Sequence, residues 1–153
     1  MPEQRILIVD DNAKYAEWVR AVLEHAGYLV DHVWNAKSGV DTIQANPAKY
    51  TAVFSDITME HPGAGLFMVP KLRRLGYQGA IVLVSTGFDY QSVFLLSRFT
   101  LGLLGVDGLV VKRELLQHGR WHIKWITQKQ RTQDLRQTMA AIQSVPNWEK
   151  KQN

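Results

Sequence analysis

Residues 50–56, YTAVFSD, are a short apolar run that ends in a carboxylate, and they decide the fold that we predict. Three other largely apolar runs also stop abruptly at polar residues. They are Ile6 to Val9 before Asp10-Asp11, Ile81 to Val84 before Ser85-Thr86, and Val106 to Val111 before Lys112. Such runs are typical of parallel strands that are buried on both faces. If all four belong to one sheet, their polar ends lie together along one edge, with Asp56 among them.

Helical patterns alternate with these strands. The spacing of apolar residues predicts helices between Asn12 and Gly27, over residues 36–45 and 65–75, and from Gly87 to Gly105, with a further strand over residues 28–34. Pro70 lies inside the third helical pattern, and we expect that helix to start late, with Pro70 in its first turn. The short connections predict right-handed crossovers. The fold class is therefore α/β, a three-layer doubly wound sandwich with five parallel strands.

The last forty residues predict an extended C-terminal helix. From Arg113 on, an apolar stripe could cover the sheet; it consists of Leu115, Leu116, Trp121, Trp125 and Ile126. Residues 127–134 contain almost nothing apolar, and the stripe resumes at Leu135, Met139 and Ile142. We divide the chain into a domain of residues 1–126 and a helical extension with a tail, residues 127–153. The extension is either a projecting arm or a contact for a partner.

Composition excludes several classes of site. The 153 residues include no cysteine, so disulfides, thiolate catalysis and cysteine-ligated metals are excluded. No apolar run reaches the roughly 18 residues of a membrane span, and we expect a cytoplasmic protein. The net charge of +4 comes from residues 112–153, which carry nine Lys/Arg and three Asp/Glu. Such a segment could attract nucleic acid, but a solvated basic helix explains it equally well, so nucleic-acid binding is a weak hypothesis.

The polar residues at the sheet edge predict a site for a tetrahedral oxyanion. Asp10, Asp11 and Asp56 would repel one another there, and crowded carboxylates usually recruit a cation. Because every ligand is a hard oxygen, that cation is expected to be Mg²⁺ rather than zinc. Lys112 and a hydroxyl, Thr86 or Ser85, would neutralise and hydrogen-bond the oxyanion.

The segments ILIVDDN, FSDITM, LVSTG and GVDGLVVK, in this order and spacing, resemble the receiver domain of two-component response regulators. The resemblance covers roughly residues 4–126. It implies a flavodoxin-like fold with strand order 2-1-3-4-5. It also implies phosphotransfer from a histidine kinase or phosphotransfer protein to Asp56, the phosphoacceptor.

The resemblance also assigns a role to each position that matches the family's motif. Asp11 and Asp56 would bind Mg²⁺ directly, Asp10 through water, and Thr58 through its backbone carbonyl. Thr86 would be the switch hydroxyl, chosen over Ser85 because Gly87 follows it. Lys112 would pair with a phosphoryl oxygen.

Four positions depart from the family pattern. Glu60 replaces a proline, and the loop glycine, Gly65, comes one place late, which indicates a one-residue insertion beside the acceptor. Leu109 stands at the aromatic switch position of the fifth strand, so the usual coupling to an aromatic rotamer cannot operate. Arg113 replaces a proline that is preceded by a cis bond. Either the Lys112–Arg113 peptide is trans, or it retains a strain of about 3 kcal/mol.

The resulting function hypothesis is a single-domain response regulator that signals through protein contacts. The downstream partner is unknown, and residues 88–143 are the expected contact region. The fourth helix is so apolar that some of its side chains should be exposed or should cover a homodimer contact. The alternative is a phosphorylation-independent, receiver-like oligomerisation module.

A phosphatase on a similar scaffold would need a general acid two residues after the nucleophile, where this chain has Thr58. We therefore expect no enzyme activity beyond self-catalysed phosphotransfer and slow self-dephosphorylation.

Overall fold

The computed structural model describes residues 3–57, 59, 63–85 and 91–148, with the backbone alone for residues 91–97. In chain order the elements are β1 Arg5–Val9, α1 Ala13–His25, β2 Leu29–Val33, α2 Ala36–Ala45, a 3₁₀ turn at Pro47–Lys49, β3 Ala52–Asp56, α3 Ala64–Arg74, β4 Ala80–Ser85, α4 Gln91–Leu104, β5 Gly108–Val111, α5 Lys112–His118, β6 Ile123–Trp125 and α6 Gln130–Met139. The sheet order is β2-β1-β3-β4-β5-β6. The first five strands are parallel, which confirms the predicted order, and β6 is antiparallel to β5.

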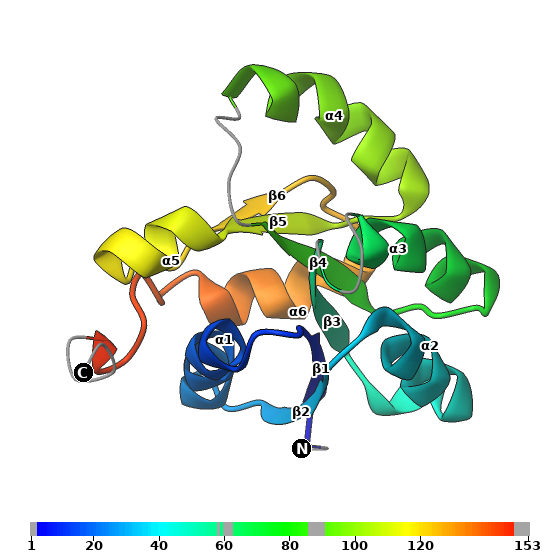
Figure 1. Cartoon of the computed structure of the whole chain (residues 1–153), viewed down its shortest axis with the longest axis horizontal. Coiled ribbons are helices and arrows are strands. Elements are labelled where there is room, and N and C mark those ends of the chain that lie inside the picture. Colours follow the sequence, from blue (N-terminus) through cyan, green and yellow to red (C-terminus); the bar gives the residue numbers. More distant parts are fainter. Residues whose placement is uncertain (1–2, 58, 60–62, 86–90, 149–153) are drawn as a thin grey trace.

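Two apolar layers enclose the sheet, because alternate residues of each strand face opposite sides. Ile6 and Ile8 of β1 join a cluster with α1, α5, α6 and Trp121, whereas Leu7 and Val9 join a cluster with α2 and α3. Figure 1 shows α1 and α5 on one side of the sheet and α2 and α3 on the other. The double burial confirms the sandwich predicted from continuous apolar runs.

The long helix predicted from Arg113 is wrong. Helix α5 ends at His118, and Gly119 follows with a left-handed φ of 62°. A Cβ at Gly119 would lie 2.5 Å from the Trp148 ring, so glycine is needed there for both its conformation and its size. The chain then forms β6 and a separate α6. Leu116, predicted to cover the sheet, is exposed.

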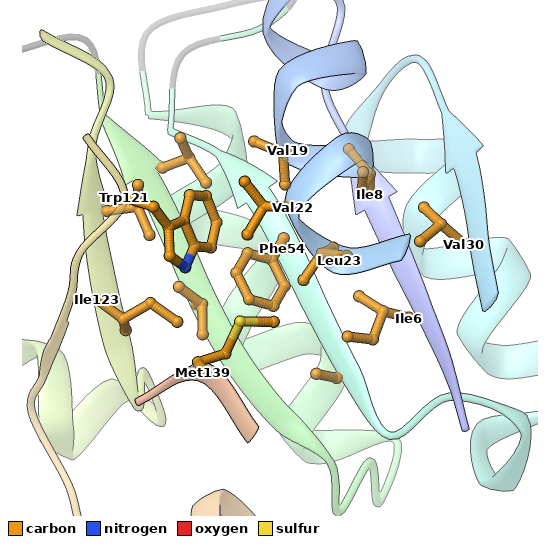
Figure 2. Close-up of a cluster of buried hydrophobic side chains, with 14 of the residues drawn as sticks. Ile6, Ile8, Val19, Val22, Leu23, Val30, Phe54, Trp121, Ile123 and Met139 are labelled. Atoms are coloured by element: carbon orange, nitrogen blue, oxygen red, sulfur yellow. The ribbon is translucent and has the colours of Figure 1, made fainter. Parts of the chain in front are cut away.

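The described part of the C-terminal extension packs on its own chain. Leu135 and Met139 of α6 are buried with Val22, Phe54 and Trp121 in the cluster that Figure 2 shows. The Trp121 ring stacks on Phe54, with ring centroids 6.0 Å apart. Residues up to Val145 therefore complete the core on this face instead of projecting from it. The division of the chain at residue 126 stays a prediction.

Helix α3 does not start late. It runs from Ala64 to Arg74 with Pro70 inside it, and Met68, Val69 and Leu72 bury its inner face. We attribute its persistence to this packing, which outweighs the single backbone donor that proline lacks. Among the described residues, no helix is long and apolar enough to cross a membrane.

Gly65 lies where α3 meets the end of β3. A Cβ there would fall 1.7 Å from the Asp56 carbonyl oxygen, and the Gly65 N–H donates to the Ile57 carbonyl at 3.0 Å. Only a residue without a side chain fits so close to that backbone. Gly65 therefore holds the loop after β3 against the end of that strand.

Candidate functional site

Charged residues gather at the carboxyl ends of three parallel strands, as predicted. Asp10 follows β1, Asp56 ends β3, and Lys112 begins α5 directly after β5. In the register of the sheet Val9 is opposite Ser55, and Asp56 is opposite Val84. The three side chains therefore converge although more than a hundred residues separate the first from the last.

Lys112 bridges the two buried carboxylates. Its Nζ lies 3.0 Å from Asp56 Oδ2 and 3.2 Å from Asp10 Oδ2. Asp10 is 2% exposed, Asp56 5% and Lys112 1%, so water screens these charges weakly. One ammonium cannot neutralise two carboxylates, and the buried cluster carries a net negative charge when all three groups are ionised.

Asp11 adds a third carboxylate at the surface. One carboxylate oxygen from each of Asp10, Asp11 and Asp56 lies within 4.8 Å of the others, while Asp11 itself is exposed. Oxygen ligands with excess negative charge suit a hard divalent cation. The donor set therefore fits Mg²⁺, and Asp11 leaves the site open to solvent on one side.

The backbone holds Asp10 in place. Its N–H donates to the Val33 carbonyl at 3.1 Å, and its Oδ1 accepts the Asn12 N–H at 2.9 Å. His32 Nε2 lies 2.8 Å from the Asp10 carbonyl oxygen. The Asn12 side chain in turn caps α1 by accepting the N–H groups of Lys14 and Tyr15. One turn thus orients the carboxylate and starts the helix beside it.

Tyr15 and His32 contact the site although our sequence reasoning gave them no role. The Tyr15 ring lies under Lys112, with Nζ 4.3 Å from the ring centroid. A cation over an aromatic face is attracted to it, most strongly where water is excluded. The signals available were the place of Tyr15 in the first turn of the helix after Asp10-Asp11, and that of His32 on the strand beside β1.

Other predicted site residues are only partly described. Thr58, Glu60 and Thr86 lie outside the described residues. Ser85, the alternative switch hydroxyl, is buried at the end of β4 opposite Val111. Leu109 is buried on the α2 and α3 side of the sheet. The described backbone contains no cis peptide, so the Lys112–Arg113 bond is trans, yet Lys112 still reaches Asp56.

Comparison with known families identifies the family of the chain that carries this acidic site. A sequence model of the response regulator receiver domain matches residues 6–97. The chain belongs to this family. Receiver domains are signalling modules rather than conventional enzymes, in agreement with the sequence expectation. The matched segment of this receiver includes all three aspartates and ends before Lys112, which the fold brings to them.

Solved receiver structures share the architecture. A CheY-like receiver from Methanospirillum hungatei is 25% identical with a TM-score of 0.57, and the match covers 75% of this chain and 89% of that one. A sensor protein from Polaromonas is 26% identical with a TM-score of 0.56 and coverages of 72% and 83%. The receiver domain of an Arabidopsis thaliana histidine kinase, solved with Mg²⁺ and BeF₃⁻, is 19% identical with a TM-score of 0.59 and coverages of 74% and 84%.

Proposed function

We propose that this receiver accepts a phosphoryl group on Asp56 from the phosphohistidine of a histidine kinase or phosphotransfer protein, and that it signals through protein contacts. The observation that carries the proposal is the buried group of Asp56, Asp10 and Lys112 with Asp11 at its mouth. Such a kinase would supply the phosphoryl group in the cytoplasm. The Arabidopsis receiver was solved with Mg²⁺ and BeF₃⁻ bound, and the proposal carries the same chemistry over to this chain.

The contacts of the three carboxylates favour Asp56 as the nucleophile. Both oxygens of Asp10 are engaged, Oδ1 by the Asn12 N–H and Oδ2 by Lys112. Asp11 is exposed and, in the described part of the chain, forms no ion pair with Lys112. Asp56 combines a place in the centre of the sheet with a lysine 3.0 Å away, which could neutralise charge on an incoming phosphoryl oxygen.

In the proposed step, an Asp56 carboxylate oxygen attacks phosphorus, and the phosphorus–nitrogen bond breaks with its electron pair going to the imidazole. Asp11, Asp56 and the Thr58 carbonyl would hold Mg²⁺, with Asp10 behind a water. The bound ion would neutralise charge on the phosphoryl oxygens. Lys112 would move from sharing two carboxylates to pairing with a phosphoryl oxygen. Thr86 would donate a hydrogen bond to another.

We propose that α4 and the start of the extension form the partner surface within residues 88–143. Phe99 and Leu103 are 75% and 73% exposed. Together with Ile126 they line a hollow of about 430 Å³ that Arg98 and Lys129 flank. No acidic residue lines this hollow among the described residues. An apolar surface edged by cations fits a downstream protein that presents an apolar and acidic segment, or a second copy of this chain with such a segment.

The first test is phosphorylation by acetyl phosphate, followed by intact mass spectrometry. Wild type should gain one phosphoryl group when Mg²⁺ is present and none after chelation. Asp56→Asn should gain none. Asp41→Asn is the matched control, because Asp41 is an exposed aspartate on α2 that pairs with Lys37. Labelling of Asp56→Asn at the wild-type level would contradict the assignment of Asp56 as the phosphoacceptor.

One observation favours the second candidate, a phosphorylation-independent module. Leu109, at the position of the family's aromatic switch, is buried in a core cluster, so this position has no aromatic rotamer to couple to the site. Light scattering with and without beryllofluoride separates the two candidates. A change in molar mass or in partner affinity on adding beryllofluoride supports the switch, and no change in either supports the second candidate.

A further inference from the structure

The buried ammonium of the acidic site has an uncharged partner in addition to its two carboxylates. Lys112 Nζ lies 3.0 Å from Asp56 Oδ2 and 3.2 Å from Asp10 Oδ2, and it also lies 4.3 Å from the centroid of the Tyr15 ring. The negative face of an aromatic ring attracts a cation at this distance. Because Lys112 is buried, water screens that attraction weakly. The ring therefore helps to determine where the ammonium lies.

The Tyr15 ring is held in place by contacts that do not involve Lys112. The Tyr15 N–H donates to Asn12 Oδ1 at 3.2 Å, and the Asn12 N–H donates to Asp10 Oδ1 at 2.9 Å. The ring meets the buried Trp18 indole edge to face, with centroids 5.5 Å apart and an interplanar angle of 83°. The turn that orients the Asp10 carboxylate thus also fixes the ring beside the ammonium.

Lys112, in contrast, depends on the contacts of its ammonium. It is the first residue of α5, and Val111 before it makes no side-chain cap. A lysine carries its charge on a long flexible stem, so its partners decide where that charge lies. In the proposed phosphotransfer one of those partners changes, because the Asp56 carboxylate becomes an acyl phosphate. The Tyr15 ring keeps its charge distribution throughout that step.

We propose that Tyr15 is a positioning residue that directs the Lys112 ammonium toward the phosphoryl group on Asp56. The ring attracts the ammonium but offers it no charged acceptor, so it does not compete with a phosphoryl oxygen as a third carboxylate would. The Tyr15 hydroxyl is not needed for this role. The inference rests on the proposed phosphotransfer to Asp56 and adds to it a residue that acts through Lys112.

The experiment compares initial rates of phosphorylation by acetyl phosphate at saturating Mg²⁺, followed by intact mass spectrometry. Tyr15→Leu should slow labelling about tenfold, which corresponds to the loss of a desolvated cation–ring contact. Tyr15→Phe keeps the ring face and should be labelled at the wild-type rate. Phe67→Leu is the matched control, because Phe67 is an exposed aromatic residue on α3. Calorimetric titration should show that Tyr15→Leu binds Mg²⁺ as tightly as wild type, since Lys112 is no metal ligand.

A second series separates the charge distribution of the ring from its packing. Phenylalanine with an increasing number of ring fluorines is placed at position 15, which keeps the ring shape and weakens its negative face. The labelling rate should fall stepwise from that of Tyr15→Phe toward that of Tyr15→Leu. This series keeps the ring, so it does not depend on the folding of Tyr15→Leu.

Three results would overturn the role of Tyr15 while Asp56 remains the phosphoacceptor. They are a wild-type labelling rate in Tyr15→Leu, full rates throughout the fluorinated series, and weaker Mg²⁺ binding in Tyr15→Leu, which would indicate a general disturbance of the acidic site. Failure of wild type itself to be labelled would overturn the proposed phosphotransfer, and this inference with it.

Discussion

The two ends of the parallel strands each bury aspartate, but they balance its charge in opposite ways. At the amino end of β5, Asp107 is fully buried and contacts two arginines, with Arg73 Nη2 and Arg131 Nη2 each 2.9 Å from it. It also accepts the Thr127 hydroxyl at 2.6 Å and the Ile81 N–H at 3.0 Å. At the carboxyl ends, Asp10 and Asp56 share Lys112 alone among the described cations.

The difference separates a site that the chain completes by itself from the site that we propose to be reactive. Around Asp107 the cations outnumber the carboxylate, and burial together with the charge of Arg131 lowers the pKa of Arg73 from its ordinary value. All its partners belong to the chain, so the cluster joins α3, β4, β5 and α6 without needing a ligand. Around Asp56 the carboxylates outnumber the cation. A bound divalent ion or another cationic partner would neutralise the excess negative charge.

Isosteric substitution at the two ends should give the largest contrast. Asp107→Asn leaves two buried guanidinium groups without their carboxylate, and we expect it to lower the free energy of unfolding by about 3–5 kcal/mol. Asp10→Asn should lower it by at most about 1 kcal/mol, because Lys112 keeps Asp56 at 3.0 Å. Urea denaturation measures both. Equal losses in the two variants would contradict the distinction between the sites.

Substitution of Tyr15 tests whether its ring stabilises the acidic site in addition to the ion pairs of Lys112. Tyr15→Leu removes the ring beneath Lys112 Nζ, and we expect a loss of about 1–2 kcal/mol in the free energy of unfolding. Tyr15→Phe keeps the ring face and serves as the control, with stability near wild type. In a Lys112→Met background the Tyr15→Leu effect should shrink. An undiminished effect there would assign it to the contact of Tyr15 with Trp18 instead.

The smallest expected effect concerns a carboxylate nearer the surface, Asp31. It accepts the Tyr50 hydroxyl at 2.7 Å and pairs with Arg5 at 2.6 Å. Burial and the Asp31 carboxylate raise the pKa of Tyr50 to about 12, from about 10 in the unfolded chain. As pH rises past 10 the unfolded chain loses this proton first, so stability should fall between about pH 10 and pH 12.

Denaturation at several alkaline pH values checks this fall, and Tyr50→Phe should make it shallower. Some fall should remain in that variant, because burial also raises the pKa of Tyr77. If Tyr50→Phe loses stability as steeply as wild type over this range, the fall has another source. The carboxylate of Asp31 would then have no measurable link to Tyr50.

The sequence predicted those features that depend on a residue's place at a strand end. Asp10, Asp56 and Lys112 each directly follow or end an apolar run, and parallel pairing alone brings such positions together. Strand β6 escaped prediction because its three residues are too few for their alternation to be distinguished from a helical stripe, and because the helix before it ends at Gly119. Helix α6 lies within the predicted C-terminal helix, and Leu135 and Met139 of its predicted apolar stripe are buried, but the sequence did not show that the helix begins anew at Gln130.

Asp107 could not be predicted as a cluster centre. Its partners Arg73, Thr127 and Arg131 are 34, 20 and 24 residues away in the chain, so no local pattern links them. Asp107 lies directly before β5, within the sequence run from Val106 to Val111, and our reading of that run gave it no role. Tyr15 likewise belongs by its spacing to the apolar stripe of α1. Its contact with Lys112, which is distant in sequence, can be seen only in the folded structure.

The most direct test of the central claim is chemical localisation of the phosphoryl group. The protein would be phosphorylated with acetyl phosphate and Mg²⁺, and borohydride would then reduce the acyl phosphate to homoserine for peptide mass spectrometry. We predict homoserine at position 56 and unmodified aspartate at positions 10, 11 and 107. Homoserine at position 10 or 11, or its absence everywhere, would contradict the assignment of Asp56 as the reactive carboxylate.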